Sequence, residues 1–91
     1  MVAIVATSAE EVKILRGTSD ADIPFAGIRR LMRKLCFDER FRGDHHIFTR
    51  DNVEEILNLQ PRGSKAKPYQ VKQVRGVVLR YKLRLEEGNG K

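Results

Sequence analysis

The apolar residues change their spacing at Phe37, and this change limits the folds open to the chain more than any other feature of its sequence. After Pro24, a residue that is tolerated in the first turn of a helix, they recur at helical spacing. Those helical positions are Phe25, Ile28, Leu31, Met32 and Leu35. Beyond Phe37 apolar and polar residues alternate, with turn signals at Gly43-Asp44 and Asp51-Asn52. The pattern predicts one helix followed by three antiparallel strands, over residues 37–42, 45–50 and 53–60.

Two further helices are predicted, one before and one after this region. A short helix through Val12 and Ile14 is expected to end at Gly17, a residue that readily takes the left-handed conformation. A longer helix should follow Pro68, since its apolar residues form one stripe. The stripe consists of Val71, Val74, Val77, Val78 and Tyr81. No internal repeat or linker divides the chain, and its 91 residues suffice for one modest core.

The predicted elements define a fold class. Three strands that bury one face under two helices form an α+β sandwich, and the order α-β-β-β-α is that of double-stranded RNA-binding domains. We expect this sandwich to span residues 23–85. Residues 1–22 are predicted to be an extension with a short extra N-terminal helix, and residues 86–91 a frayed tail. The order of elements is a topological analogy and implies no activity by itself.

The positive charge of the chain lies mainly in its C-terminal half. The formal net charge is +6, and residues 62–84 contain no Asp or Glu. The basic residues of this segment are Arg62, Lys65, Lys67, Lys72, Arg75, Arg80, Lys82 and Arg84. Such a potential attracts a polyanion or an acidic protein; the alternative is a solvated helix face. Lys65 and Lys67 occupy the place where RNA-binding domains of this order put a basic loop against phosphates.

The two histidines of the chain, His45 and His46, follow the first turn directly. Histidine can take and give a proton near neutral pH, so a placed imidazole can act as a general base. Successive strand residues point to opposite faces, so only one of the two can be the working imidazole. The same opposition argues against a metal held by both, and we expect no metal and no cofactor. Alternatively, both are ordinary strand residues with hydrogen-bonded rings.

The cysteine content and the first residues of the chain indicate its cellular location. Cys36 is the single cysteine, which excludes an internal disulfide and fits a reducing cytoplasm. The apolar start, residues 1–6, has no basic residue before it and runs into Glu10 and Glu11. We therefore expect no signal peptide, no membrane span and a cytoplasmic protein.

Several blocks of the sequence, between about Lys13 and Leu83, together resemble one protein family. They are Ile14-Leu15-Arg16-Gly17, Ser19-Asp20-Ala21, Leu35-Cys36-Phe37, Arg42-Gly43-Asp44-His45-His46-Ile47-Phe48, Val53-Glu54-Glu55-Ile56-Leu57-Asn58-Leu59-Gln60-Pro61 and Lys65-Ala66-Lys67-Pro68-Tyr69-Gln70-Val71. In this combination, Gly-x-x-His-x-Phe followed by Lys-Pro-Tyr-Gln-Val is similar to the HicA toxins (YcfA-like proteins). These are the mRNA-cleaving halves of bacterial toxin–antitoxin pairs.

The resemblance implies a double-stranded RNA-binding-like fold and a metal-independent ribonuclease that is inhibited by a HicB-type antitoxin. The catalytic histidine of the family lies three residues after the motif glycine, which is His46 here. We expect His46 to deprotonate a ribose 2′-OH while nearby cations stabilise the charge that develops on the phosphate. The residues predicted to contact RNA are Arg42, His45, Lys65, Lys67, Lys72 and Arg75.

Departures from the family pattern leave two other functions open. Asp44 stands where serine is usual, which adds a negative charge beside the site, and Cys36 stands where glycine is usual. The chain could therefore be a degenerate toxin that mainly binds its antitoxin, in which case Asp44→Ser could restore cleavage. It could also be a non-catalytic RNA-binding module, which would have no need of His46.

Overall fold

The computed structural model describes residues 9–84, and the predicted tail 86–91 lies outside this range. The described residues form three helices and one antiparallel sheet of three strands in the order β1-β2-β3. The elements are α1 (Ala9–Arg16), α2 (Phe25–Lys34), β1 (Asp38–Arg42), β2 (His45–Arg50), β3 (Val53–Leu59) and α3 (Pro68–Tyr81). This confirms the predicted α+β class and order of elements. None of the described helices has the length and apolar character needed to cross a membrane.

Two of the strands are one residue shorter than predicted, for a local reason in each case. The first begins at Asp38 because the N–H of Phe37 is used in the turn that ends α2, where it donates to Met32 O at 3.0 Å. The third ends at Leu59 because the N–H of Gln60 donates to the side chain of Gln70 at 3.2 Å. Both boundaries therefore depend on bonds to helices.

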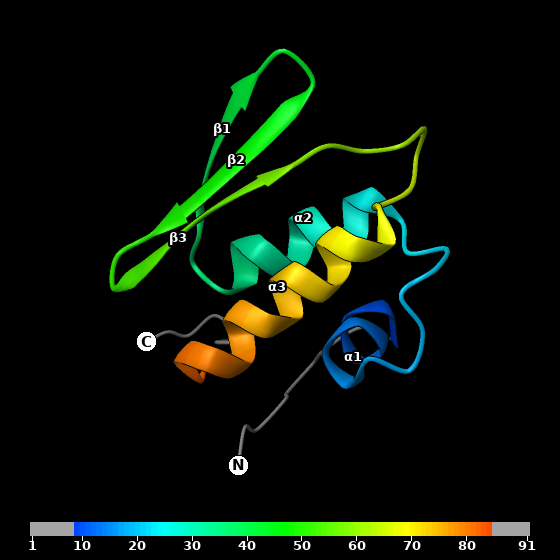
Figure 1. Cartoon of the computed structure of the whole chain (residues 1–91), viewed down its shortest axis with the longest axis horizontal. Helices are drawn as coiled ribbons and strands as arrows, with labels where there is room; N and C mark the ends of the chain where they lie inside the picture. The colour runs from blue at the N-terminus through cyan, green and yellow to red at the C-terminus, as the bar shows by residue number, and fades with distance from the viewer. Residues whose placement is uncertain (1–8, 85–91) are drawn as a thin grey trace.

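The three helices lie on one side of the sheet, with α2 and α3 next to it and α1 farther away (Figure 1). The face of the sheet toward the helices contributes Phe48, Leu57 and Leu59 to the core, and all three are buried. Ile14 of α1 belongs to the same apolar cluster, so the short N-terminal helix shares the core of the sandwich. The other face carries exposed residues such as Ile56.

The loop before α3 is paired with the chain that leads into α2. Ala66 N donates to Ile23 O at 2.8 Å, and Phe25 N donates to Ser64 O at 2.9 Å. These bonds place Lys65 opposite Pro24 in an isolated bridge. The N-terminus of α2 and the basic loop are therefore neighbours, although they are far apart in the sequence.

Helix α2 ends in a Schellman turn whose left-handed residue is Cys36, with φ of +68°. Cys36 N donates to Arg33 O at 2.9 Å and Phe37 N to Met32 O at 3.0 Å, as this motif requires. A residue with a Cβ atom is strained there by roughly 1–2 kcal/mol, whereas glycine is not. We expect Cys36→Gly to raise the free energy of unfolding by about 1 kcal/mol, measured by urea denaturation. Cys36→Ala keeps the strain and serves as the control, so equal stability of the two variants would contradict this account.

Candidate functional site

His46 lies on β2, the central strand, on the face that looks toward the helices. Its side chain is 14% exposed, and its ring lies between two phenylalanine rings. The ring centroids of Phe25, at the start of α2, and of Phe41, on β1, are each 4.8 Å from that of His46. Both contacts are edge-to-face, with interplanar angles of 67° and 63°. The ring is therefore held by apolar walls from two elements.

A carboxylate completes the surroundings of the His46 ring. Glu39 Oε2 lies 2.7 Å from Nδ1 of His46 and accepts a bond from Nε of Arg29 at 2.8 Å. The other oxygen, Oε1, accepts from Nη2 of Arg29 at 3.2 Å and lies 3.6 Å from Nη2 of Arg33. Burial raises the pKa of Glu39, but the bonds from Arg29 and His46 outweigh this effect and leave its pKa below the ordinary value. The carboxylate therefore remains ionised at neutral pH.

The second ring nitrogen of His46, Nε2, has no polar partner in the described part of the chain, since it makes no hydrogen bond and no ion pair within residues 9–84. The guanidinium of Arg29, which bonds to the same Glu39 oxygen as Nδ1 of His46, lies over the Phe41 ring, 5.6 Å from the centroid. Phe41 itself is 62% exposed. A partly exposed nitrogen base, an arginine and an aromatic surface are therefore side by side on this edge of the sheet.

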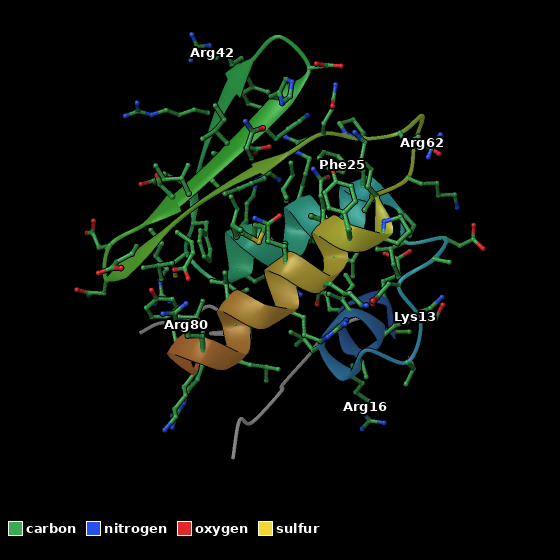
Figure 2. The ribbon with its side chains drawn as sticks, in the orientation of Figure 1. Lys13, Arg16, Phe25, Arg42, Arg62 and Arg80 are labelled. Carbon is green, nitrogen blue, oxygen red and sulfur yellow. The ribbon has the colours of Figure 1, made fainter. Side chains whose placement is uncertain are left out.

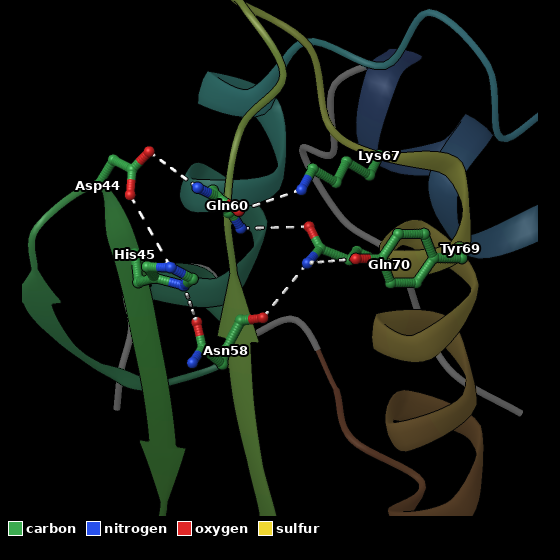
Figure 3. A network of polar contacts seen from close by, with 7 residues as sticks. All are labelled: Asp44, His45, Asn58, Gln60, Lys67, Tyr69 and Gln70. Carbon is green, nitrogen blue, oxygen red and sulfur yellow. Dashed lines mark hydrogen bonds and ion pairs between the residues drawn. The ribbon is translucent and has the colours of Figure 1, made fainter.

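His45 points to the opposite face of the sheet, as the alternation predicted. Its Nδ1 lies 2.8 Å from Oδ1 of Asn58, and its Nε2 lies 3.9 Å from Oδ1 of Asp44. Asp44 also accepts a bond from Gln60 at 2.8 Å, which holds the pKa of Asp44 below its usual value (Figure 3). Among the described residues, the side-chain contacts of Asp44 are with His45 and Gln60 and not with His46.

The network around His45 continues to the N-terminus of α3 (Figure 3). The side chain of Gln60 accepts a bond from Nζ of Lys67 at 3.1 Å. Gln70 is buried, and its Nε2 donates to the backbone oxygen of Asn58 at 3.3 Å and contacts the hydroxyl of Tyr69 at 3.5 Å. These bonds join the start of β2, the end of β3 and the first turn of α3, so Lys67 is held close to the sheet.

Of the remaining residues predicted to contact RNA, three are exposed and one, Arg75, is paired with a carboxylate. Arg42 and Lys72 are exposed, and Lys65 is exposed in the loop that pairs with Pro24. Arg42 extends outward from the end of β1 (Figure 2). Within the described part of the chain, none of these three side chains forms an ion pair. Their cationic groups are therefore available to an anionic ligand.

Arg75 is engaged in holding α1 and its following loop against α3. Its Nη1 and Nη2 donate to the two carboxylate oxygens of Asp20 at 2.8 and 3.1 Å, and Nη1 also donates to Ile14 O at 3.1 Å. The hydrogen bond from Arg75 lowers the pKa of Asp20, and Asp20 raises that of Arg75. These bonds occupy the guanidinium, so Arg75 has a structural role between α1 and α3.

Sequence reasoning gave no role to Glu39, Arg29 and Phe25, which surround His46 in the structure. Glu39 did carry a signal, because the alternation places this charged residue between Phe37 and Phe41 on one side of the strand. A carboxylate on a side that is otherwise apolar needs a partner. Which partner it finds depends on the register between β1 and β2 and on the packing of α2, which the pattern does not specify.

Within residues 9–84, no three His, Cys, Asp or Glu side chains are grouped so that they could hold a metal ion. Comparison with protein-family models, with curated proteins and with solved structures found no match.

Proposed function

We propose that this chain is a HicA-like toxin: a metal-independent endoribonuclease that cleaves mRNA in the cytoplasm, with a double-stranded RNA-binding-like fold and His46 as its base. The observation that carries the proposal is the placement of His46. Its ring is fixed by Phe25, Phe41 and Glu39, while its Nε2 makes no bond to the described part of the protein. A histidine that served only packing would not need a free nitrogen at a partly exposed edge.

The proposed reaction needs only groups of the chain and of RNA. Nε2 of His46 takes the proton of a ribose 2′-OH, and the 2′-oxygen forms a bond to the adjacent phosphorus. The bond from phosphorus to the 5′-oxygen of the next nucleotide breaks, and this oxygen takes a proton from water. The products are a 2′,3′-cyclic phosphate and a 5′-hydroxyl, and the imidazolium returns its proton to solvent.

In the proposed reaction, cationic side chains that bind the RNA would stabilise the charge that develops on the phosphate oxygens. Lys65 and Arg42 are exposed, and Lys67 lies at the N-terminus of α3, where backbone N–H groups favour an anion. Lys72 and His45 would contact more distant parts of the RNA. The net charge of +6 supports a polyanionic substrate and, by the resemblance to HicA, an acidic surface on a HicB-type antitoxin.

The proposal is tested with end-labelled RNA in EDTA. We expect cleavage of the RNA and none of a matched DNA, and a single 2′-deoxy nucleotide at a cleaved position should abolish the cut there while other cuts persist. The deoxy substitution removes the attacking oxygen and leaves the phosphate unchanged, so a cut that survives it would contradict the mechanism. RNA that stays intact but is retarded in a gel, with retardation lost as salt rises, would instead identify a binding module.

A further inference from the structure

Glu39 is a largely buried charged residue that has no part in the reaction proposed for His46. Its side chain is 9% exposed, and both carboxylate oxygens accept hydrogen bonds from Arg29. Burying a charge is costly unless it is paired and hydrogen-bonded, so such a group is retained where its bonds are used. Besides the arginine bonds, Glu39 Oε2 has one further hydrogen-bond contact, with Nδ1 of His46 at 2.7 Å.

The register of the sheet explains how Glu39 reaches His46. Phe41 of β1 lies opposite His46, and Glu39 lies opposite Phe48, so Glu39 is the diagonal neighbour of His46 on the same face. Diagonal neighbours on adjacent strands are within reach of long side chains. Arg29 approaches the same oxygen of Glu39 from α2. One carboxylate oxygen is therefore shared by the proposed base and by an arginine.

We propose that Glu39 is a positioning residue of this site, which holds His46 as the tautomer with its proton on Nδ1 and its lone pair on Nε2. An ionised carboxylate can only accept hydrogen bonds, so the Nδ1 that faces it must carry a proton. In the neutral ring the other nitrogen, Nε2, is then the acceptor. Glu39 also holds Arg29 beside the ring. The catalytic part of this inference rests on the function proposed above, whereas the tautomer does not.

The tautomer is measured without any substrate, by long-range ¹H–¹⁵N correlation on protein that contains ¹⁵N-labelled histidine. The signals of His46 are assigned by comparison with His46→Ala, and the spectra are recorded for the neutral form of the ring. We expect the Nδ1 of His46 in the parent protein to show the shift of a protonated nitrogen and Nε2 that of an unprotonated one. A ring protonated on Nε2, or an even mixture of the two tautomers, would overturn the proposal without any variant.

Glu39→Gln tests the consequence for cleavage, because its amide nitrogen can donate to Nδ1 and favour the other tautomer. We expect the cleavage rate to fall at least about 100-fold, as is typical when a histidine base loses the carboxylate that fixes its tautomer. Glu55→Gln is the matched control, since Glu55 of β3 also accepts bonds from a ring hydroxyl and an arginine, namely Tyr81 at 2.7 Å and Arg80 at 3.0 Å. The cleavage rate of Glu55→Gln should be within a few-fold of that of the parent protein.

The two proposals fail in different ways. If the parent protein does not cleave RNA but His46 is protonated on Nδ1, the ribonuclease proposal is wrong and the structural role of Glu39 stands. If the parent cleaves RNA, and a folded Glu39→Gln keeps both the parent tautomer and the parent rate, the positioning role of Glu39 is wrong. Thermal unfolding followed by circular dichroism shows whether the variant is folded.

Discussion

His46→Ala is expected to lower the rate of RNA cleavage by about 10²–10⁴-fold, the contribution typical of a positioned general base. The ring of His46 presents Nε2 at an edge where the described residues make no bond to it, so its removal leaves the ribose 2′-OH without a base. Alanine should disturb the fold little, because the ring is not fully enclosed by the core. Cleavage is measured as the initial rate of loss of an end-labelled RNA under single-turnover conditions.

His45→Ala is the matched control for that experiment. The two histidines are adjacent, yet His45 is on the opposite face of the sheet, where it contacts Asn58 and Asp44. We expect His45→Ala to weaken RNA binding modestly and to keep the cleavage rate at saturating protein within about tenfold of the parent. A large loss in His45→Ala together with full activity in His46→Ala would reverse the assignment of the base.

Phe48→Ala is expected to lower the free energy of unfolding by about 3–5 kcal/mol, the usual cost of deleting a buried aromatic side chain. Phe48 is 0% exposed and lies at the centre of the sheet, between Glu39 of β1 and Leu57 of β3. Small domains have total stabilities of roughly 5–15 kcal/mol, so the variant should be close to unfolding at room temperature. Urea denaturation followed by circular dichroism measures the difference.

Phe41→Ala is the control, because it makes the same substitution at an exposed position and so shows how much of the effect is due to burial. Phe41 lies on the neighbouring strand but is 62% exposed, so its truncation removes much less surface from the core. We expect a loss of about 1 kcal/mol or less. Equal costs for Phe41→Ala and Phe48→Ala would mean that the core is not centred on Phe48.

The elements of the fold could be predicted from the sequence because their signals are local. Two-residue alternation in the strands, turn residues such as Gly43 and Asn52, and the apolar stripes of the helices are each contained within a few neighbouring positions. The opposite orientation of His45 and His46 follows from the same alternation, and the structure has it. The strand boundaries differ from the predicted ones where a backbone N–H bonds outside the sheet: that of Phe37 to Met32 O, and that of Gln60 to the side chain of Gln70.

The surroundings of His46 could not be predicted in the same way, because they combine three separate elements. Phe25 comes from α2, Phe41 and Glu39 from β1, and His46 from β2. The ion pair of Arg75 could not be predicted for the same reason. Arg75 lies in the one-signed basic segment, and its carboxylate partner Asp20 comes from a loop 55 residues earlier. Charge runs along the chain do not reveal such long-range pairs.

The position of β1 at the border of the sheet has a consequence for solubility. Within the described part of the chain β1 pairs with β2 alone, so its other side presents free backbone groups to which a second molecule could add a strand. Four of its five residues are charged, namely Asp38, Glu39, Arg40 and Arg42, and charges on a border strand oppose such association. Asp38, Arg40 and Arg42 are exposed, so their charges contribute most to keeping molecules apart. A variant that loses one of these charges should therefore be compared with the parent at low protein concentration, where association of two molecules through β1 is weak.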